Sequence, residues 1–267
     1  MIKVAPLRYD VIFKKVFSKP HIFTAFVKDI AGIDIEIDKV ETEKSFAKNI
    51  GKIGSRFDLF AEDKKNRIIV DIQHKRHSDH YDRFLYYHCA AILQQATNSK
   101  NYGAPMRVYT IVILTSGDKY KTPVSTTDFA PKTIEGESLE ETQHKIIYIC
   151  PKYLNEKTPE TYQEWLKAID DSLDGEVEES KYHNPIIHEI FATIEEEQIT
   201  PQEYARMKDE YSNEEYLLKK TQQAKQEGRQ EAVEDNAKKM LEKGLDFALI
   251  SEITGLSLDS LKKILRK

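Results

Sequence analysis

Two aspartates and a glutamine stand at a spacing that could bring three oxygen-bearing side chains together. Asp58 lies in one apolar run, and Asp71 and Gln73 lie two apart in the next. Side chains two apart on a strand point to the same face. Carboxylate oxygens are the ligands that a hard divalent ion such as Mg²⁺ selects, usually one or two together with waters and phosphate. The pattern predicts a metal site at Asp58 and Asp71, with the carbonyl of Ile72 as a third ligand and Mn²⁺ as a substitute ion.

A metal site of this kind is suited to phosphodiester hydrolysis, in which a metal polarises the phosphate and activates water. Gln73 cannot act as a base, but its amide can orient the attacking water. Asp10 could hold a further water or a second metal ion, or could simply cap a helix. Two structural alternatives also stand: Asp58 on a solvated sheet face, and Asp71 paired with a nearby Lys or Arg.

The run from Arg56 to Gln73 is typical of a β-hairpin that would position these side chains. Three apolar residues are expected on one face of its first strand and three on one face of its second, joined by a polar turn. They are Phe57, Leu59 and Ala61, and then Ile68, Val70 and Ile72.

Helices and strands are expected on both sides of this hairpin. Amphipathic helices are predicted from Asp10, with Asp10 as N-cap, and from His21 to Ile30, followed by a strand over Asp34–Glu43. After the hairpin, the pattern favours a long helix from Tyr81 and then a buried strand, Val108-Tyr-Thr-Ile-Val-Ile-Leu. This order indicates an α/β fold with a mixed central sheet flanked by helices.

Four cations or aromatics near the hairpin are candidates for contact with a polyanion. Lys75 and Arg76 follow the hairpin directly, and Arg83 and Tyr86 share one face of the next helix. Arg83 and Tyr86 could touch the scissile phosphate or position Gln73. Alternatively, Arg83 pairs with an acid and Tyr86 fills the core.

The net charge of −5 conceals an uneven distribution of charge along the chain. Residues 1–131 carry 21 Lys and Arg against 15 Asp and Glu (21 − 15 = +6), and residues 132–218 carry 8 against 22 (8 − 22 = −14). The remaining residues carry 11 against 8 (11 − 8 = +3). The hairpin thus belongs to a basic segment, which suits a polyanionic substrate. No apolar run approaches the roughly 20 residues of a membrane span, and the N-terminus lacks a signal-peptide core, so we expect a cytoplasmic protein without membrane contact.

The tail from Glu214 is expected to be a long charged helix followed by a helix–turn–helix. Its Lys262, Lys263, Arg266 and Lys267 could contact DNA phosphates, or the tail could pack on a partner or on a second copy of the chain as a homodimer. Seven apolar residues are expected to form its small core. They are Leu245, Leu249, Ile250, Ile253, Leu256, Leu261 and Ile264.

Several blocks, in this order, resemble the PD-(D/E)XK nuclease superfamily and its transposase-associated branch, the Rpn-type recombination-promoting nucleases. These blocks are Tyr9-Asp10-Val-Ile-Phe-Lys-Lys-Val-Phe, Phe57-Asp58-Leu-Phe, Val70-Asp71-Ile-Gln73, Arg83-Phe-Leu-Tyr86-Tyr87, Cys150-Pro-Lys-Tyr153, Glu164-Trp165-Leu, Ala224-Lys-Gln-Glu-Gly228, Met240-Leu-Glu-Lys-Gly244 and Ile253-Thr-Gly255-Leu256-Ser257. The resemblance implies a restriction-endonuclease-like core, Mg²⁺-dependent DNA cleavage and a link to recombination. Asp58, Asp71 and Gln73 match the family's Asp and Glu-x-Gln. One departure is Asp71, which is one methylene shorter than the usual Glu and reaches less far to a metal.

We therefore expect a Mg²⁺-dependent DNA endonuclease with a nuclease core over residues 1–153, an acidic helical segment over 154–213 and a helical tail over 214–267. One alternative is a DNA-binding or assembly protein of the same fold without turnover. Another is a nuclease for RNA or branched DNA.

Overall fold

The computed structural model describes residues 1–46, 54–74, 80–95, 104–139 and 141–265. The chain divides into two compact units, residues 1–208 and 209–267. The boundaries expected from the sequence, after residues 153 and 213, stay predictions. In the described residues, no helix is both long enough and apolar enough to cross a membrane.

A six-stranded mixed sheet lies at the centre of the first unit, in the strand order β2-β3-β4-β5-β7-β6. Its strands are β2 (Glu41–Ser45), β3 (Arg56–Glu62), β4 (Asn66–Gln73), β5 (Arg107–Leu114), β6 (Val124–Asp128) and β7 (Lys145–Ile149). The first three strands pair antiparallel, β4, β5 and β7 pair parallel, and β6 returns antiparallel to β7. Two short strands, β1 (Ile2–Lys3) and β8 (Glu176–Val177), pair separately. The predicted hairpin is confirmed as β3 and β4.

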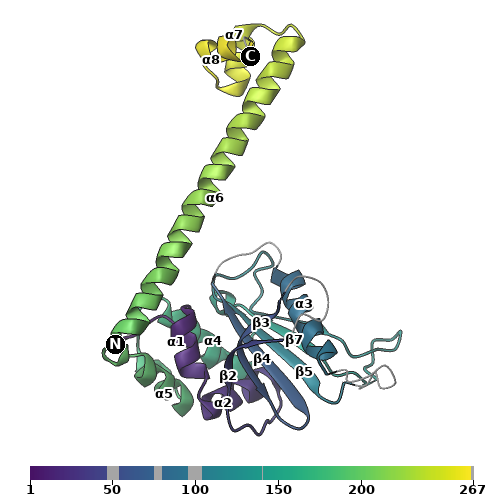
Figure 1. Cartoon of the computed structure of the whole chain (residues 1–267), viewed down its shortest axis with the longest axis vertical. Coiled ribbons are helices and arrows are strands. Elements are labelled where there is room, and N and C mark those ends of the chain that lie inside the picture. The colour runs from purple at the N-terminus through teal and green to yellow at the C-terminus, as the bar shows by residue number, and fades with distance from the viewer. Residues whose placement is uncertain (47–53, 75–79, 96–103, 140, 266–267) are drawn as a thin grey trace. The chain divides into compact units, whose positions relative to one another are not determined.

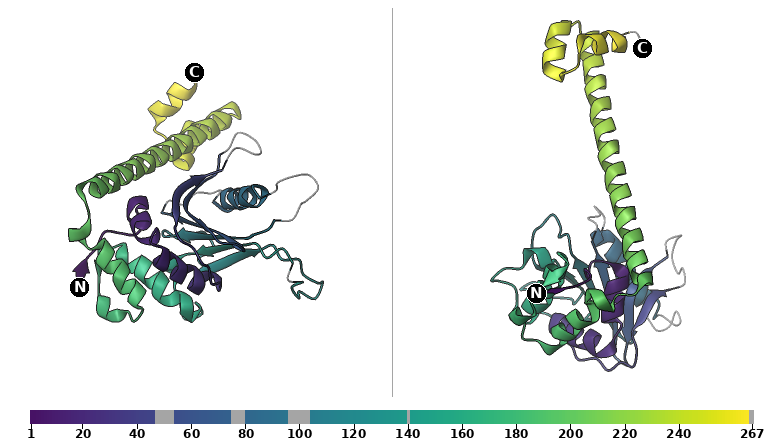
Figure 2. Two further views of the ribbon diagram at one scale, coloured as in Figure 1. Left: turned by 60° about the horizontal axis from the view of Figure 1, so that its bottom comes forward. Right: turned by 90° about the vertical axis from the view of Figure 1, so that its left-hand side faces the viewer.

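Helices cover both faces of this sheet (Figures 1 and 2). On one face lie α1 (Asp10–Phe17), α2 (Pro20–Ala31), α4 (Glu160–Ser172) and α5 (Pro185–Ile194), and on the other lies α3 (His80–Leu93). The four-helix face holds the largest apolar cluster, in which Phe26 meets Trp165 edge to face at 5.1 Å. Short 3₁₀ helices lie at Pro151–Tyr153, Glu179–Lys181 and Glu196–Gln198. The mixed sheet between helices confirms the predicted α/β fold class.

The strand expected over residues 34–43 is wrong for most of its length. Residues 32–40 are irregular, and the strand observed here is β2. The alternating isoleucines nevertheless contribute to the core: Ile35 is buried, and Ile33 and Ile37 pack against the large cluster. The apolar alternation thus indicates burial rather than a strand in residues 34–40, because the pairing with β3 on this side begins only at Glu41.

The second unit contains most of α6 (Pro201–Glu242) together with α7 (Phe247–Thr254) and α8 (Leu258–Leu265). Helix α6 begins before the predicted Glu214 and continues through Gly228. Asp246 caps α7 by accepting the Ala248 N–H at 2.9 Å, and Gly255 ends it at a φ of +73°. Such a left-handed C-cap suits glycine, which has no Cβ to clash. The predicted helix–turn–helix is present as α7 and α8.

The core of this small unit differs in part from the prediction. Ala237, Ile250 and Leu261 are buried at its centre. Leu249 and Ile253, expected inside, are 45% and 56% exposed. Their places are taken by apolar residues of α6, which lies outside the helix–turn–helix and therefore outside the prediction, and by Phe247 at the start of α7, which the prediction missed. These are Ala237, Met240, Leu241 and Phe247.

Candidate active site

The centre of the site is the point at which β3 and β4 stop pairing with one another. Their register runs from Glu62 opposite Arg67 to Leu59 opposite Val70. Beyond it, the Asp58 N–H donates to Asp71 Oδ1 at 3.3 Å, and the Ile72 N–H donates to Asp58 Oδ2 at 3.1 Å. Each carboxylate therefore accepts a backbone N–H of the opposite strand, in place of the carbonyl that would accept it in a regular β-ladder. These two hydrogen bonds hold the aspartates together.

The side-chain alternation of β3 changes at the same place. Leu59 joins the cluster below the four-helix face, whereas Phe57 packs against Phe60 and Tyr87 on the α3 face. The prediction that Phe57 shares a face with Leu59 is therefore wrong. The interruption lies at Asp58. The pairing of β2 with β3 skips both Asp58 and Glu43, and Glu43 has a left-handed φ of 57°. A regular two-residue period cannot represent such a break.

Burial disfavours the ionised form of both carboxylates. Asp71 is 2% exposed, and its Oδ2 is buried without a hydrogen-bond partner among the described residues. Burial, and then the charge of Asp58, raise the pKa of Asp71 well above its ordinary value. Burial and then the charge of Asp10 raise the pKa of Asp58, although the Ile72 N–H and the Lys14 ammonium oppose the shift. A divalent cation would relieve this repulsion and supply a partner for the orphaned oxygen.

Helix α1 brings a third acid and a lysine to this site. Asp10 is the first residue of the helix rather than its N-cap, which is Tyr9, so the capping prediction is wrong. The Lys14 ammonium lies 2.7 Å from Asp10 Oδ2, 2.6 Å from Glu43 Oε1 and 4.0 Å from Asp58 Oδ1. Lys14 and Glu43 were not among the sequence candidates. The four-residue spacing of Asp10 and Lys14 on one helix face was the available signal for the lysine.

Helix α3 approaches the carboxylates from the other face of the sheet. The positive charge of Arg83 acts on Asp71, and its guanidinium lies over the Phe84 ring at 4.8 Å from the ring centre. The Nε of Arg83 is buried without a hydrogen-bond partner among the described residues. Tyr86 is half-buried, and its neighbour Tyr87 is the tyrosine whose pKa rises through burial, with the charges of Asp71 and Asp58 adding to the effect. The structure thus brings Arg83 within electrostatic reach of Asp71.

The end of β4 is held by the loop that follows β5. The Gln73 carbonyl accepts the Thr115 N–H at 3.0 Å and its hydroxyl at 3.2 Å, and the Ser116 hydroxyl donates to the His74 carbonyl. Gln73 is half-buried and Ile72 is 6% exposed. The proposed roles of the Gln73 amide and the Ile72 carbonyl stay predictions. Lys75 and Arg76 lie outside the described residues.

The donor set fits a hard divalent ion with few protein ligands. The described part of the chain contains no group of three or more His, Cys, Asp or Glu arranged to hold a metal. Mg²⁺ does not require one, because it keeps several waters and is commonly bound by one or two carboxylates. Asp58 and Asp71 supply two carboxylates, and among the described residues Asp71 Oδ2 has no hydrogen-bond partner, although the charge of Arg83 acts on Asp71.

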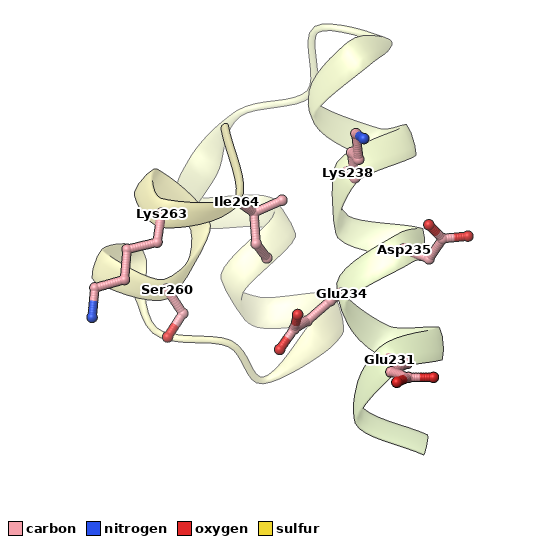
Figure 3. Close-up of a pocket in the computed structure, with 7 residues that line it drawn as sticks. All are labelled: Glu231, Glu234, Asp235, Lys238, Ser260, Lys263 and Ile264. Atoms are coloured by element: carbon pink, nitrogen blue, oxygen red, sulfur yellow. The ribbon is translucent and has the colours of Figure 1, made fainter. Parts of the chain in front are cut away.

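The second unit offers a surface of different character. A pocket in this unit is lined by four residues of α6 and three of α8 (Figure 3). They are Glu231, Glu234, Asp235 and Lys238, and then Ser260, Lys263 and Ile264. Three acids in seven residues would repel phosphate, so this pocket is a poor site for DNA. Lys262 and Lys263 of α8 are both exposed.

Two family models match the chain. Residues 7–226 match the family described as PD-(D/E)XK nuclease family transposase, and residues 236–265 match the Rpn/YhgA-like nuclease family, C-terminal HTH domain. No curated protein and no solved structure matches the chain. The first match spans most of the sequence and the second covers α7 and α8. This chain therefore belongs to the PD-(D/E)XK nuclease family transposases and carries the C-terminal helix–turn–helix domain of the Rpn/YhgA-like nucleases.

Proposed function

We propose that this protein is a metal-dependent endonuclease that hydrolyses phosphodiester bonds in DNA. The observation that carries the proposal is the carboxylate pair formed by the half-buried Asp58 and the buried Asp71, where β3 and β4 part and each carboxylate is bonded to the other strand's backbone. Family membership supports the nuclease chemistry, and the helix–turn–helix match supports DNA as the partner. The transposase description supports a role in recombination or mobile elements.

Each residue of the site has a distinct part in this proposal. Asp58 and Asp71, with the Ile72 carbonyl, hold Mg²⁺ or Mn²⁺. The bound ion supplies Lewis acidity to the phosphate and lowers the pKa of a water molecule. Gln73 orients the attacking water through its amide. Arg83, whose charge already reaches Asp71, binds the scissile phosphate.

Further DNA contacts come from outside the carboxylate pair. Tyr86 follows Arg83 by three residues on α3, and Lys75 and Arg76 precede that helix. Asp10 acts on the carboxylate pair rather than on DNA, because it bonds to the Lys14 ammonium that also lies near Asp58. The exposed Lys262 and Lys263 of the tail contact phosphates away from the cut.

Nicking of supercoiled plasmid with and without Mg²⁺ tests the proposal. Asp58→Asn and Asp71→Asn each keep an acceptor for the backbone N–H but remove the charge, and each is expected to lower the rate at least 100-fold. Asp34→Asn is the matched control, because Asp34 is exposed and pairs only with the exposed Lys28 among the interactions described. Cleavage that persists at the wild-type rate in both site variants would contradict the proposal.

Other outcomes separate the alternative functions. Salt-sensitive DNA binding without nicking under Mg²⁺ or Mn²⁺ would identify a binding or assembly protein of the same fold. Faster cleavage of RNA or of branched DNA than of duplex, measured side by side, would redefine the substrate. Both comparisons use the full chain with its C-terminal domain.

A further inference from the structure

The Lys14 ammonium is surrounded by carboxylates from three separate elements. Asp10 comes from α1, Glu43 from β2 and Asp58 from β3, with oxygens at 2.7, 2.6 and 4.0 Å from Nζ. The Lys14 side chain is only 13% exposed, so solvent screens these interactions weakly. Three carboxylates from separate elements thus share one ammonium as their common cation.

The carboxylates of the site differ in how closely cations approach them. Lys14 bonds to Asp10 and to one oxygen of Glu43, and Arg56 bonds to the other oxygen of Glu43. On the α3 side, the buried Asp71 Oδ2 has no hydrogen-bond partner among the described residues. The two carboxylates with the weaker compensation are therefore Asp58, whose Oδ1 lies 4.0 Å from Lys14, and Asp71, on which the charge of Arg83 acts without a hydrogen bond to Oδ2 among the described residues.

We infer that the Lys14 ammonium occupies the place of a second cation, so that the centre binds one divalent ion, at Asp58 and Asp71. This inference rests on the proposed metal dependence but concerns the number of ions rather than the reaction. Lys14 supplies a fixed positive charge beside Asp58, at a position that a second divalent ion would otherwise take. Without that charge, Asp10 and Asp58 lose the cation that lies near both, and Glu43 keeps its ion pair with Arg56.

The number of Mn²⁺ ions bound per full-length chain tests the inference, measured by calorimetric titration and by the fraction of free Mn²⁺ in electron paramagnetic resonance. If the wild type binds n ions, the Asp58→Asn/Asp71→Asn double variant is expected to bind n − 1. Differences of this kind cancel any ions bound elsewhere, for example at the acidic residues of the α6–α8 pocket. Lys14→Met is expected to bind n + 1, because it keeps the length of the side chain and removes the charge.

Two variants control for the change at position 14. Lys14→Arg keeps a cation and is expected to bind n ions. Lys15→Met removes the next lysine on α1, which bonds to Glu203 and to the Gln198 carbonyl instead of the site, and is also expected to bind n. Circular dichroism checks that Lys14→Met is folded. If it is not, the wild type and the double aspartate variant still decide the number.

The inference is overturned if the double variant binds n − 2 ions, or if folded Lys14→Met binds n. Plasmid nicking on the same preparations separates this result from the proposed function. Loss of one ion in the double variant with no nicking by the wild type would support the Lys14 assignment and contradict the nuclease. Loss of two ions in the double variant, together with nicking by the wild type, would contradict the Lys14 assignment and support the nuclease.

Discussion

At Asp71, the protein keeps a carboxylate almost wholly out of water with one oxygen unpaired among the described residues. An unsatisfied buried acceptor costs about 1–3 kcal/mol, and more when it is charged. Burial and the charge of Asp58 raise its pKa in the folded protein above the ordinary value of 3.8. The folded chain therefore binds this proton more tightly than the unfolded chain does. Stability from this group is complete below 3.8 and is lost as the pH rises through the folded pKa.

Asp71→Asn is accordingly expected to raise the free energy of unfolding of the metal-free protein by about 1–3 kcal/mol at neutral pH. It should also flatten the loss of stability as the pH rises above 3.8, measured by urea unfolding in the presence of a chelator.

Asp63→Asn provides a contrast of opposite sign. Slight burial raises the pKa of Asp63, but the Lys65 and Asn66 N–H groups outweigh it and the net shift is downward. Asp63 therefore stabilises the fold above its unfolded pKa, and Asp63→Asn should lower the free energy of unfolding at neutral pH.

For Asp71, equal profiles of unfolding free energy against pH in the wild type and in Asp71→Asn would contradict the assignment of the pH dependence to Asp71.

At the scale of elements, the loop after β5, which holds the end of β4, is itself fixed by a close contact between Gly117 and Tyr153. Gly117 has a φ of +69°, and a Cβ there would lie 2.4 Å from the Tyr153 ring. The Tyr153 hydroxyl donates to the Asp118 carbonyl at 3.3 Å, and Asp118 also accepts the Tyr81 hydroxyl at 2.6 Å. The loop is thereby tied to α3 and to the segment after β7.

Gly117→Ala is expected to destabilise the protein by about 2–4 kcal/mol, because it combines a left-handed backbone with a steric clash. Gly136→Ala isolates the first effect, since Gly136 has a φ of +92° and a Cβ there would meet none of the described residues within 4 Å. It should cost about 1–2 kcal/mol. Thermal unfolding of both variants measures the difference, and equal losses would show that the Tyr153 contact is relieved without cost.

The elements themselves followed from the sequence wherever a local pattern determined them. The apolar alternation around Asp58 and Asp71 was sufficient to predict the hairpin. It was not sufficient to place Phe57, because the interruption at Asp58 depends on β2 and α3. Lys14 could have been found from its four-residue spacing to Asp10, but Glu43 could not, because its contact with Lys14 joins residues 29 positions apart through tertiary structure. Sequence periodicity carries no information about such a meeting.

At the scale of the whole molecule, the nuclease-type unit and the helix–turn–helix unit share the task of binding DNA in our proposal. The second unit is small, and its core centres on Ala237, Ile250 and Leu261. Its exposed Lys262 and Lys263 are suited to phosphate contacts rather than to base recognition.

Lys262→Gln/Lys263→Gln is expected to weaken DNA binding and to reduce the slope of log K against log salt by roughly 2, or about 0.9 for each lost phosphate contact. Cleavage at saturating DNA should change little, because the cut is made in the other unit. Lys220→Gln/Lys225→Gln on α6 is the matched control for charge. An unchanged salt slope in the α8 variant would show that α8 does not contact phosphates.

The exchanged hydrogen bonds at the end of the hairpin make two backbone amides sensitive to the ionisation of the site. The Asp58 N–H bonds to Asp71 Oδ1, and the Ile72 N–H bonds to Asp58 Oδ2. Protonation of either carboxyl, or its coordination to an ion, changes the acceptor that the amide meets. In ¹⁵N–¹H spectra, these two resonances should therefore shift together on Mg²⁺ addition and on acidification. The amide of Ile69, within the regular β3–β4 ladder, should stay in place. The backbone would thus report the occupancy of the site without any label on the substrate.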